Sequence, residues 1–510
     1  MYVLTNEEMR EADGYTIGTL GVPSLVLMER AGKALAEEAQ NLAKSGRIVC
    51  VCGGGNNGGD GFVCARILKE QGREVDAVFF AERISEECRV NLKKWQAVGG
   101  EILTAIPKDR EYALIVDCLV GTGLRGALTG KNVETAKDIC ERKHLGAKVL
   151  SADIPSGVCG ENGKAEGAAV QADVTLCIGE MKVGTALGDG LDYAGVRKRA
   201  DIGIVLPHKD YATEADRALI KSILPVRKRN SHKGSYGKAA IVGGSIEYTG
   251  AAYLSAAACM RSGAGYTTLY VPKEILPYYV LKSPELLLKP SSKGYRYEFN
   301  EGKAAELLSY DSVAYGMGMG VSEAVAKGAA YLLRSYTGRL VLDADGLNSL
   351  AAYKKEEFLE LFQNKKCDVV ITPHIKEFSR LSGEEVSEII AKGLYAATPF
   401  AKEYGVTVLL KSAASILTDG KRVVLNTSGT SGQAKGGSGD VLSGVIAGLC
   451  AMGTSAFDGA CAAAYLVGKA AEIATAVKGE YSLTATDIIE SLGSAFLFVT
   501  ENADKGGGEE

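Results

Sequence analysis

The amino-acid sequence predicts an α/β protein with two domains of unequal size, each containing a parallel sheet covered by helices on both faces. Short apolar runs alternate with helix-patterned stretches in both halves of the chain, which is typical of parallel sheets buried on both faces. Of the 510 residues, 63 are glycine. This share is well above the roughly 7% of average proteins, and it indicates many tight loops next to ligands or closely packed elements.

The first half contains six strand-like runs, which we expect to form the first sheet. They are Arg47–Gly53, Glu74–Phe80, Ala113–Leu119, Lys148–Ile154, Ala172–Ile178 and Ala200–Val205. Helix-patterned stretches separate several of these runs, at Leu25–Ala43, Gly61–Gln71 and Val133–Lys143. The first domain is therefore predicted to be a three-layer structure over residues 1–210.

The domain boundary is expected in Pro207–Asn230, which is mixed and charged and contains no obvious strand. Residues 211–225 are predicted to be a linker, and residues 226–500 the second domain. Its strand-like runs are Lys238–Gly244, Tyr266–Pro272, Ser312–Gly318, Gly338–Ala344, Cys367–Thr372 and Val406–Lys411, followed by a hairpin in which Ser415–Thr418 and Arg422–Leu425 flank Asp419-Gly420-Lys421. The last residues, 501–510, are polar and glycine-rich and are expected to be disordered.

Composition excludes several classes of protein. The net charge of −4 gives no general affinity for nucleic acid or acidic membranes, so neither is expected as a partner. The 12 cysteines include no CxxC pair, which argues against a zinc ribbon or a thioredoxin-type site and favours buried, reduced thiols. No signal peptide and no charge-free run of 18 apolar residues occurs. We therefore expect a cytoplasmic protein, and we predict a homo-oligomer although no sequence pattern marks its interface.

Three loops of small residues follow predicted strands of the first domain. They are Gly53-Gly-Gly-Asn-Asn-Gly-Gly-Asp-Gly61, Asp117-Cys-Leu-Val-Gly-Thr-Gly-Leu-Arg-Gly126 and Asp153-Ile-Pro-Ser-Gly157. Ligands of open parallel sheets bind beyond the carboxyl ends of the strands, so these loops are expected to converge on one ligand. The first loop is not a dinucleotide fingerprint, since no acidic ribose partner stands out about 20 residues further on.

Several side chains in these loops are candidates for chemistry. Asn57, Asp117 and Ser156 supply hard oxygen donors, which suit an alkali or alkaline-earth cation better than zinc. Asp153 stands at the end of a predicted strand, in the sequence Asp153-Ile-Pro155. In a poorly hydrated crevice it would act as an acid or a base. The alternative for each carboxylate is a capping or turn role, for which Asp60 is a good candidate.

Near the C-terminus, the run Lys435-Gly-Gly-Ser-Gly-Asp440 opens directly into an apolar, helix-like stretch, Val441–Met452. Small residues let the backbone approach a phosphate, and the unpartnered amides of a helix N-terminus favour an anion there. An aspartate at this position would be repelled by phosphate unless a metal ion or a proton transfer used its charge. The run therefore indicates a phosphoryl-transfer site with its own general base; the alternative is a glycine-rich turn before a core helix.

The motifs resemble two known enzyme domains. Gly55-Asn-Asn-Gly-Gly-Asp-Gly61, with Asp117, Gly121-Thr-Gly123 and Asp153-Ile-Pro-Ser-Gly157, resembles the NAD(P)H-hydrate epimerase domain. The second half resembles the ADP-dependent NAD(P)H-hydrate dehydratase of the ribokinase-like superfamily in His232-Lys-Gly-Ser-Tyr-Gly237, Gly250-Ala-Ala-Tyr-Leu254, Arg261-Ser-Gly-Ala-Gly265, Gly316-Met-Gly-Met-Gly320, Asp343-Ala-Asp-Gly-Leu-Asn348, Thr372-Pro-His374 with Glu377, Lys411-Ser-Ala-Ala-Ser415 and Gly436-Gly-Ser-Gly-Asp440. In this order the motifs cover nearly the whole chain. Their arrangement is similar to that of the fused, bifunctional hydrate repair enzymes.

The resemblance implies a Rossmann-like first domain, a ribokinase-like second domain and two successive activities. Hydration of NAD(P)H at the C5–C6 double bond of the nicotinamide ring leaves a hydroxyl at C6, in R and S forms. Phosphorylation by ADP would turn this hydroxyl into a good leaving group, and the lone pair of the ring nitrogen would help expel phosphate and regenerate NAD(P)H. The dehydratase of the family accepts the S form, so the epimerase would rescue the R form. NADHX and NADPHX, the hydrated cofactors, and ADP are the implied small-molecule partners.

The resemblance also assigns roles to residues. In the first domain, Asn57, Asp117 and Ser156 would hold K⁺, Asp153 would lie at the reacting ring, and the dinucleotide would contact Asn56, Asn57, Gly58, Gly59, Asp60, Gly121, Thr122, Gly123, Leu124, Arg125, Gly126 and Ala127. In the second domain, Asp440 would take the proton from the C6 hydroxyl, while Gly318 and His374 would contact the substrate. ADP, used with Mg²⁺, would bind to Lys411, Ser412, Ala413, Ala414, Ser415, Ser431, Gly432, Gln433, Ala434, Lys435, Gly436, Gly437, Ser438 and Gly439.

Some residues depart from the family pattern. Ser412 and Ser415 stand where glycine and threonine are usual, which keeps the residues small and keeps one hydroxyl. Lys376 replaces a glycine and would either clash with the phosphates or pair with them. Lys435 replaces a common threonine and would add positive charge near the presumed phosphates. None of these changes removes a residue assigned to chemistry.

Two other functions remain open from the sequence. The second domain could be a ribokinase-like kinase that phosphorylates a small alcohol and stops there. The first domain could be a nucleotide-binding or interaction module without activity of its own.

A lone histidine such as His374 is more often structural, but its position after Thr372-Pro373 at a strand end favours ligand contact.

Overall fold

The computed structural model describes residues 1–501, which form two compact units, Met1–Ala212 and Thr213 onward. The expected linker, 211–225, contains the strand β10 (Thr213–Glu214) and the helix α7 (Arg217–Ile223). β10 pairs with β19 (Val423–Asn426), and α7 packs on two C-terminal helices of the second unit. Most of this segment is therefore part of the second unit rather than a linker. The predicted disordered tail, 501–510, lies outside the described residues except for Glu501.

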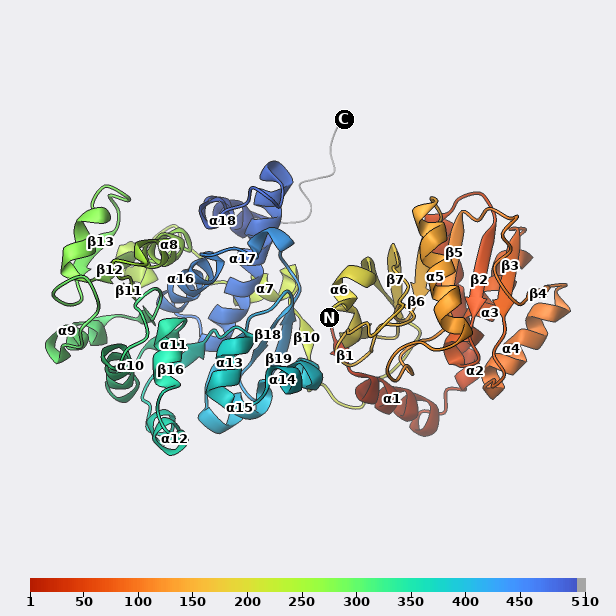
Figure 1. Ribbon diagram of the computed structural model, residues 1–510, viewed down its shortest axis with the longest axis horizontal. Coiled ribbons are helices and arrows are strands. Elements are labelled where there is room, and N and C mark those ends of the chain that lie inside the picture. The colour runs from red at the N-terminus through yellow and green to blue at the C-terminus, as the bar shows by residue number, and fades with distance from the viewer. Residues whose placement is uncertain (502–510) are drawn as a thin grey trace. The chain divides into compact units, whose positions relative to one another are not determined.

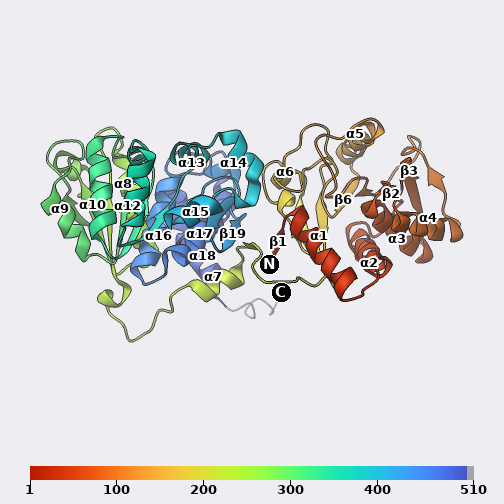
Figure 2. The ribbon, with the colours of Figure 1, turned by 90° about the horizontal axis from the view of Figure 1, so that it is seen from below.

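The first unit is built on a seven-stranded, wholly parallel sheet with the order β4-β3-β2-β5-β6-β7-β9 (Figures 1 and 2). Its strands are β2 (Ile48–Cys52), β3 (Val75–Phe79), β4 (Ile102–Leu103), β5 (Leu114–Cys118), β6 (Lys148–Ala152), β7 (Val174–Ile178) and β9 (Val196–Ala200). The short strands β1 (Val3–Leu4) and β8 (Met181–Lys182) pair with each other beside it. Its helices are α1 (Asn6–Gly14), α2 (Ser24–Leu42), α3 (Asn56–Glu70), α4 (Glu86–Ala97), α5 (Lys131–His144) and α6 (Gly190–Tyr193).

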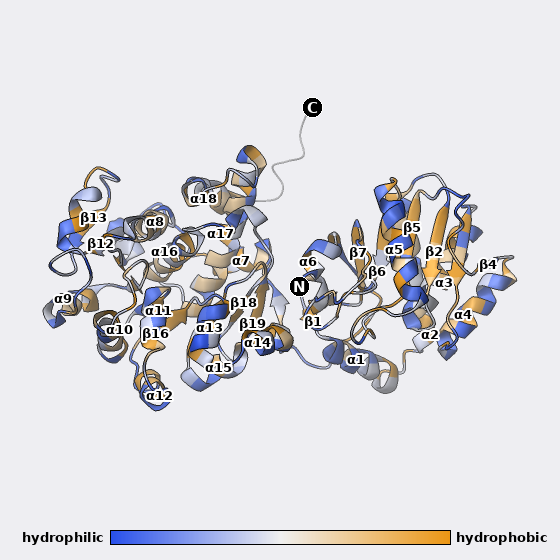
Figure 3. Cartoon of the chain, in the orientation of Figure 1, coloured by the Kyte–Doolittle hydropathy of each residue, from blue (hydrophilic) through white to orange (hydrophobic). Residues whose placement is uncertain are grey.

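Alternate side chains of each strand enter different cores, which makes the unit three-layered. Cys50 of β2 is buried among residues of α2, α3 and α4, whereas Val51 is buried on the opposite face with Ile139 of α5. Successive side chains of a strand point to opposite faces, so a strand buried on both sides is mostly apolar along its whole length. Figure 3 shows this pattern, with apolar β2 and β5 and mixed helices.

The second unit contains a ten-stranded sheet with the order β10-β19-β18-β17-β16-β15-β14-β11-β12-β13. The remaining strands are β11 (Lys238–Val242), β12 (Tyr266–Val271), β13 (Leu287–Pro290), β14 (Ser312–Tyr315), β15 (Arg339–Leu342), β16 (Asp368–Ile371), β17 (Thr407–Leu410) and β18 (Ser415–Thr418). All pairs are parallel except β17–β18 and β18–β19. The antiparallel pair β18–β19 is the predicted hairpin.

Helices cover both faces of this sheet (Figure 1). They are α8 (Thr249–Arg261), α9 (Glu301–Glu306), α10 (Glu323–Ser335), α11 (Asp345–Leu350), α12 (Lys355–Gln363), α13 (Ile375–Ser382), α14 (Val386–Lys392), α15 (Thr398–Tyr404), α16 (Ser438–Ala451), α17 (Ala456–Lys478) and α18 (Ala485–Thr500). α8, α16, α17 and α18 share one large apolar core with the sheet. The predicted α/β class with parallel sheets is confirmed.

α17 is the one helix in residues 1–501 that is long and apolar enough to cross a membrane. However, 61% of its most apolar stretch is buried inside the protein, where the helix packs against α16, α18 and the sheet. Its apolar sequence is therefore that of a core helix.

Some predicted elements were wrong, chiefly at the sheet edges. The run Ala200–Val205 is not a strand; the strand β9 precedes it and reads Val-Arg-Lys-Arg-Ala, because an edge strand needs little apolar character. The short edge strands β4, β10 and β13 were not predicted either. Because β10 lies within Pro207–Asn230, the prediction that this segment holds no strand was wrong. α3 begins at Asn56 rather than Gly61, because its first turn consists of small residues that lack an apolar pattern.

Candidate active sites

A cavity of about 1400 Å³ lies in the first unit, where the strand order reverses between β2 and β5. The chain leaves such adjacent strands toward opposite faces of the sheet, which opens a crevice at their carboxyl ends. The predicted residues that line this cavity are Asn56, Asn57, Asp60, Gly121, Thr122, Gly123 and Asp153. The three loops therefore meet at one site, as expected from the strand ends alone.

Other predicted contact residues of the first domain do not line this cavity. They are Gly58, Gly59, Leu124, Arg125, Gly126 and Ala127. A Cβ at Gly58 would lie 1.8 Å from the carbonyl oxygen of Gly53, and one at Gly59 would lie 2.6 Å from Sδ of Met28. These two glycines let α3 pack closely against β2 and its surroundings.

Asp117 and Ser156 form a buried polar pair at the end of β5. Oδ1 of Asp117 accepts a hydrogen bond from Oγ of Ser156 (2.6 Å), and Oδ2 accepts from the Ser156 amide and from Oγ of Ser151 (both 2.9 Å). Oγ of Ser156 accepts from the amide of Val120 (2.8 Å). Burial raises the pKa of Asp117 although these hydrogen bonds oppose the shift.

Asn57 is the natural third member of this group. Its side-chain oxygen and nitrogen are both buried, and neither has a hydrogen-bond partner within residues 1–501. A buried, unpaired amide is costly, and a bound ion or water commonly satisfies such a group. Carbonyl, carboxylate and hydroxyl oxygens are the donors that hard cations prefer. The donor set thus fits K⁺, and no group of three or more His, Cys, Asp or Glu residues suited to a metal occurs in the described chain.

Asp153 is held in an unusual conformation next to a buried lysine. Its φ is +68°, one of two positive values among the described residues other than glycine. Oδ1 of Asp153 lies 2.8 Å from Nζ of Lys182, whose side chain is 1% exposed, and it accepts a hydrogen bond from the Ile178 amide (3.1 Å). Strained backbone positions of this kind cluster at functional sites. Lys182 was missed in the sequence because no motif connects β8 with the loop after β6.

α1 supplies further groups that sequence reasoning missed. Met9, Arg10 and Asp13 line the cavity, and Nδ2 of Asn6 donates to the carbonyl oxygen of Thr122 (2.9 Å). The sequence Thr5-Asn-Glu-Glu8 is a capping box, which could have located this helix but not its place in the site. Asp60 lies within α3 rather than at its cap, and burial raises its pKa well above the ordinary value, so the capping alternative does not hold.

In the second unit, the N-terminus of α16 has no side-chain cap and directly follows the glycine-rich run that begins at Lys435. Its N-cap, Gly437, has a φ of +99° and provides no side-chain cap. Oγ of Ser438 instead donates to the carbonyl oxygen of Gln433 (2.8 Å), which holds the preceding loop in place. The first amides of α16 are thus available to an anion. A Cβ at Gly439 would lie 3.4 Å from Nζ of Lys411, so this lysine also borders the anion site.

Asp440, in the first turn of α16, is half-buried among other charges. Burial and the nearby carboxylate of Asp343 raise its pKa to about 7, while Lys411 opposes the shift and Asp345 adds to it. A carboxyl that exchanges its proton near neutral pH is well matched to a general base.

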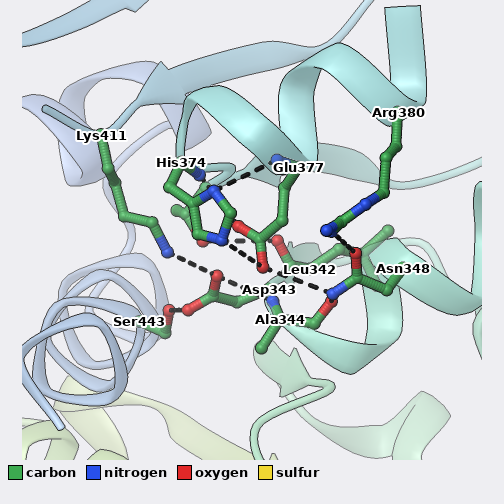
Figure 4. Close-up of polar contacts among 10 residues, drawn as sticks. Leu342, Asp343, Ala344, Asn348, His374, Glu377, Arg380, Lys411 and Ser443 are labelled. Carbon is green, nitrogen blue, oxygen red and sulfur yellow. Dashed lines mark hydrogen bonds and ion pairs between the residues drawn. The ribbon is translucent and has the colours of Figure 1, made fainter. Parts of the chain in front are cut away.

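Asp343, after β15, contacts Lys411 after β17, its neighbour Ala344, and Ser443 of α16 (Figure 4). Its Oδ1 pairs with Nζ of Lys411 (2.8 Å) and accepts from the Ala344 amide (2.8 Å), and its Oδ2 accepts from Oγ of Ser443 in α16 (2.6 Å). Ala344 has the other positive φ outside glycine among the described residues, +48°. Burial lowers the pKa of Lys411, but the carboxylates of Asp343, Glu377 and Asp440 raise it more, so that the net shift is upward.

His374 caps α13 and remains about half exposed. Its Nδ1 accepts from the amide of Glu377 (3.1 Å), whose carboxylate accepts from the amide of His374 (2.9 Å). Nδ2 of Asn348 also lies within hydrogen-bond distance of Glu377 (3.4 Å) (Figure 4). The histidine therefore has a structural role through Nδ1, while its Nε2 lies 3.5 Å from Oε1 of Glu377.

Gly318 lies at the switch point of the second sheet, between β11 and β14. Its φ is +65°, and a Cβ there would lie 2.8 Å from Cβ of Tyr248. Any larger residue would displace this neighbouring loop.

Lys435 does not approach the anion site as a free charge. Its Nζ donates to the carbonyl oxygens of Tyr481 (2.6 Å) and Leu483 (2.8 Å). The lysine therefore fastens the loop before α16 to the segment before α18. Lys376, the other charged departure from the family pattern, is exposed in the first turn of α13.

Comparison with known proteins agrees with both halves of the chain. Residues 239–493 match the family model for NAD(P)H-hydrate dehydratase, and residues 24–184 match the model for the YjeF-related protein N-terminus. A bifunctional NAD(P)H-hydrate repair enzyme of Moorella thermoacetica is 33% identical over 519 residues, which covers 96% of each chain. The chain belongs to the bifunctional NAD(P)H-hydrate repair enzymes. The resemblance inferred from the motifs is confirmed.

Two further relatives of this repair enzyme family support the assignment. The bifunctional NAD(P)H-hydrate repair enzyme of Methanothermobacter thermautotrophicus is 35% identical, with 93% of this chain and 92% of that chain covered. A crystal structure of the ADP/ATP-dependent NAD(P)H-hydrate dehydratase from Bacillus subtilis, co-crystallised with ATP and Mg²⁺, matches with 28% identity and a TM-score of 0.50. It covers 56% of this chain and 99% of that chain.

Proposed function

We propose that the protein repairs hydrated nicotinamide cofactors with two active sites. The first unit epimerises the R and S forms of NADHX and NADPHX, and the second dehydrates the S form to NAD(P)H with ADP, which yields AMP and phosphate. The observation that carries the proposal is Asp440, a carboxyl with a pKa near 7 at the open N-terminus of α16. A group that accepts a proton beside an anion site is what phosphorylation of a ring hydroxyl requires.

In the dehydratase site, the amides of Ser438 and Gly439 hold the transferred phosphoryl group, and Lys411 neutralises its charge. Asp440 removes the proton from the C6 hydroxyl as its oxygen attacks the terminal phosphorus of ADP. Gly318 and His374 position the hydrated ring. Mg²⁺ fits this site when phosphates and water supply most of its ligands, because Asp343 is already engaged by three donors. When bound, the ion neutralises charge on the phosphates.

In the epimerase site, the unpaired amide of Asn57 with Asp117 and Ser156 supports a K⁺ site beside the dinucleotide-binding loops. When bound, the ion supplies positive charge that holds these loops together. Asp153 reacts at the ring from its position next to Lys182. Asn56, Gly121, Thr122 and Gly123 contact the dinucleotide from the cavity wall.

The setting of the protein is also a proposal. All 12 cysteines are free, and ten of them are buried, which suits a reducing compartment such as the cytoplasm. A homo-oligomer remains a prediction.

Absorbance at 340 nm tests the proposal directly. Purified protein receives an R/S mixture of NADHX with Mg²⁺ and K⁺, and with either ADP or ATP. Full recovery of NADH is expected with ADP and would establish both activities. Recovery that stops when the S form is exhausted would reduce the first unit to a binding module. A stable phosphorylated product without NADH would favour the kinase alternative.

A further inference from the structure

The first helix of the chain, α1, forms part of the wall of the epimerase cavity. Asp13 projects from its last turn into the lining, directly before a π-helical turn, Tyr15–Thr19. Short π-helical segments are rare and frequently mark functional sites. The match to the N-terminal family model begins at residue 24, so this helix lies outside the matched region.

Asp13 is a carboxyl without a fixed partner. Within residues 1–501 its side chain makes no hydrogen bond and no ion pair, although it is half-buried. The charged groups that act on it are Lys182 of β8, Asp153 after β6 and Asp60 of α3, and Arg10 of its own helix also lines the cavity. Burial raises the pKa of Asp13 to about 6, Lys182 opposes the shift, and Asp153 adds to it. The group is therefore able to carry a proton near neutral pH.

Asp153 has the opposite character. Nζ of Lys182 lies 2.8 Å from its carboxylate and also donates to the carbonyl oxygens of Ile178 and Glu180. All three donors of this buried ammonium are thus used, and one of them holds the Asp153 carboxylate in place. The cavity therefore contains one carboxyl without a fixed partner and one carboxylate that a buried ammonium holds in place.

We propose that Asp13 is a second catalytic residue of the epimerase site, which donates a proton to the ring nitrogen N1 while Asp153 removes the proton of the C6 hydroxyl. Lys182 is the positioning residue that holds the Asp153 carboxylate in place. This inference rests on the epimerase activity proposed above.

The step is balanced and needs no other reactant. Asp153 takes the hydroxyl proton, the C6–O bond becomes a carbonyl, the C6–N1 bond breaks, and N1 receives the proton of Asp13. Rotation of the open chain presents the other face of the aldehyde to N1. Re-closure returns one proton to Asp13 and the other to the oxygen at C6, which now has the opposite configuration. Loss of the hydroxyl as water and re-addition of water to the other face would also use an acid and a base, but it would bring an oxygen atom from the solvent to C6, whereas ring opening keeps the original oxygen.

The test uses the full chain without nucleotide, so that dehydration does not occur. One purified epimer of NADHX is mixed with enzyme, and the other is followed by chromatography. Asp13→Asn is expected to slow epimerisation by about 10²-fold, as for the loss of a positioned acid. Glu7→Gln, an exposed carboxylate on the same helix, is the matched control and should match the wild type. An unchanged thermal unfolding curve shows that the first unit of Asp13→Asn is folded, and unchanged ADP-dependent dehydration of the S form shows that the second unit is intact.

Two further readouts separate chemistry from structure. In the wild type, epimerisation should fall as pH rises above about 6, because Asp13 must be protonated, and Asp13→Asn should lose this dependence. Lys182→Met should reduce the rate, and Lys182→Arg should restore part of it. In H₂¹⁸O, the wild type should epimerise without taking up label at C6.

The outcomes distinguish the inference from the function on which it rests. If the wild type does not epimerise NADHX, the proposed function fails, whatever Asp13 does. If the wild type epimerises and folded Asp13→Asn retains its rate within about twofold, the assignment of Asp13 is wrong. Uptake of one ¹⁸O for each epimerisation would overturn the ring-opening step.

Discussion

Lys411 and Asp343 form an ion pair of 2.8 Å that joins the loop after β17 to the end of β15. The same carboxylate holds Ser443 of α16, three residues beyond Asp440. The position of the proposed general base therefore depends on a group that does not itself react.

The dehydratase should require an ionised Asp440. Since the pKa of Asp440 is raised to about 7, dehydration should fall as pH decreases through this value. Asp343→Asn removes one of the negative charges that raise this pKa, so the midpoint should move to lower pH. Rates of NADH formation between about pH 5 and pH 9 measure it. An unchanged midpoint in a folded variant would remove Asp343 from the electrostatics of the base.

The same substitution should also lower stability. Asp343 is 2% exposed and its loss leaves the Lys411 ammonium without its charged partner. Breaking a buried pair in this way costs on the order of 3 kcal/mol, so Asp343→Asn should be assayed well below its unfolding temperature. Lys421→Gln, in the exposed hairpin turn between β18 and β19, is a control that should leave both stability and the pH midpoint unchanged.

Asp440→Ala should separate nucleotide binding from chemistry. The amides of α16 and Lys411 remain, so ADP should bind with an affinity within a few-fold of the wild type. Dehydration should fall by at least about 10²-fold, because the positioned base is lost. Calorimetry with ADP and the 340 nm assay provide the two measurements, and retained turnover would exclude Asp440 as the base.

Asp153→Asn tests the epimerase site with little change of backbone. The φ of +68° disfavours most residues, whereas asparagine tolerates this region nearly as well as aspartate. Epimerisation should fall by at least about 10²-fold while substrate still binds. A folded variant that epimerises at the wild-type rate would favour the interpretation of the first unit as a binding module.

Lys435→Met tests whether this lysine fastens a loop or binds phosphate. Its ammonium is held by the carbonyl oxygens of Tyr481 and Leu483. We expect the ratio of the ADP dissociation constants of variant and wild type to be the same at low and high salt. A phosphate contact would give a large ratio at low salt that shrinks as salt screens the charge. Lys376→Met, which removes an exposed lysine after His374, is the variant whose ADP dissociation constants are compared with those of Lys435→Met.

Potassium should matter to the first unit alone. Replacement of K⁺ by tetramethylammonium, which is too large for a site of three protein oxygens, should lower epimerisation and the unfolding temperature of the first unit. Asn57→Leu should abolish this dependence, because it removes the unpaired buried amide. Dehydration of pure S substrate should not change, and a K⁺ effect that persists in Asn57→Leu would place the ion elsewhere.

Local pattern was enough to find most strands and the candidate loops. The central strands are continuous apolar runs because both faces are buried, and the glycine-rich loops that follow them are visible in any reading of the sequence. Asp153 and Asp440 could be singled out because each stands directly after or within such a loop. Edge strands such as β9 and β13 were missed, because a half-exposed strand needs no apolar pattern.

The sequence by itself determined the α/β class, the two-domain order and the residues assigned to chemistry, since these depend on periodicity and on short motifs. Only the tertiary structure decided which groups surround them. Lys182 lies 29 residues from Asp153 and α1 lies about 140, and no local signal connects them; the sheet brings them together because β1 pairs with β8. Likewise, the partners of Lys435 are more than 40 residues further along the chain, so its charge could be seen in the sequence but its role could not.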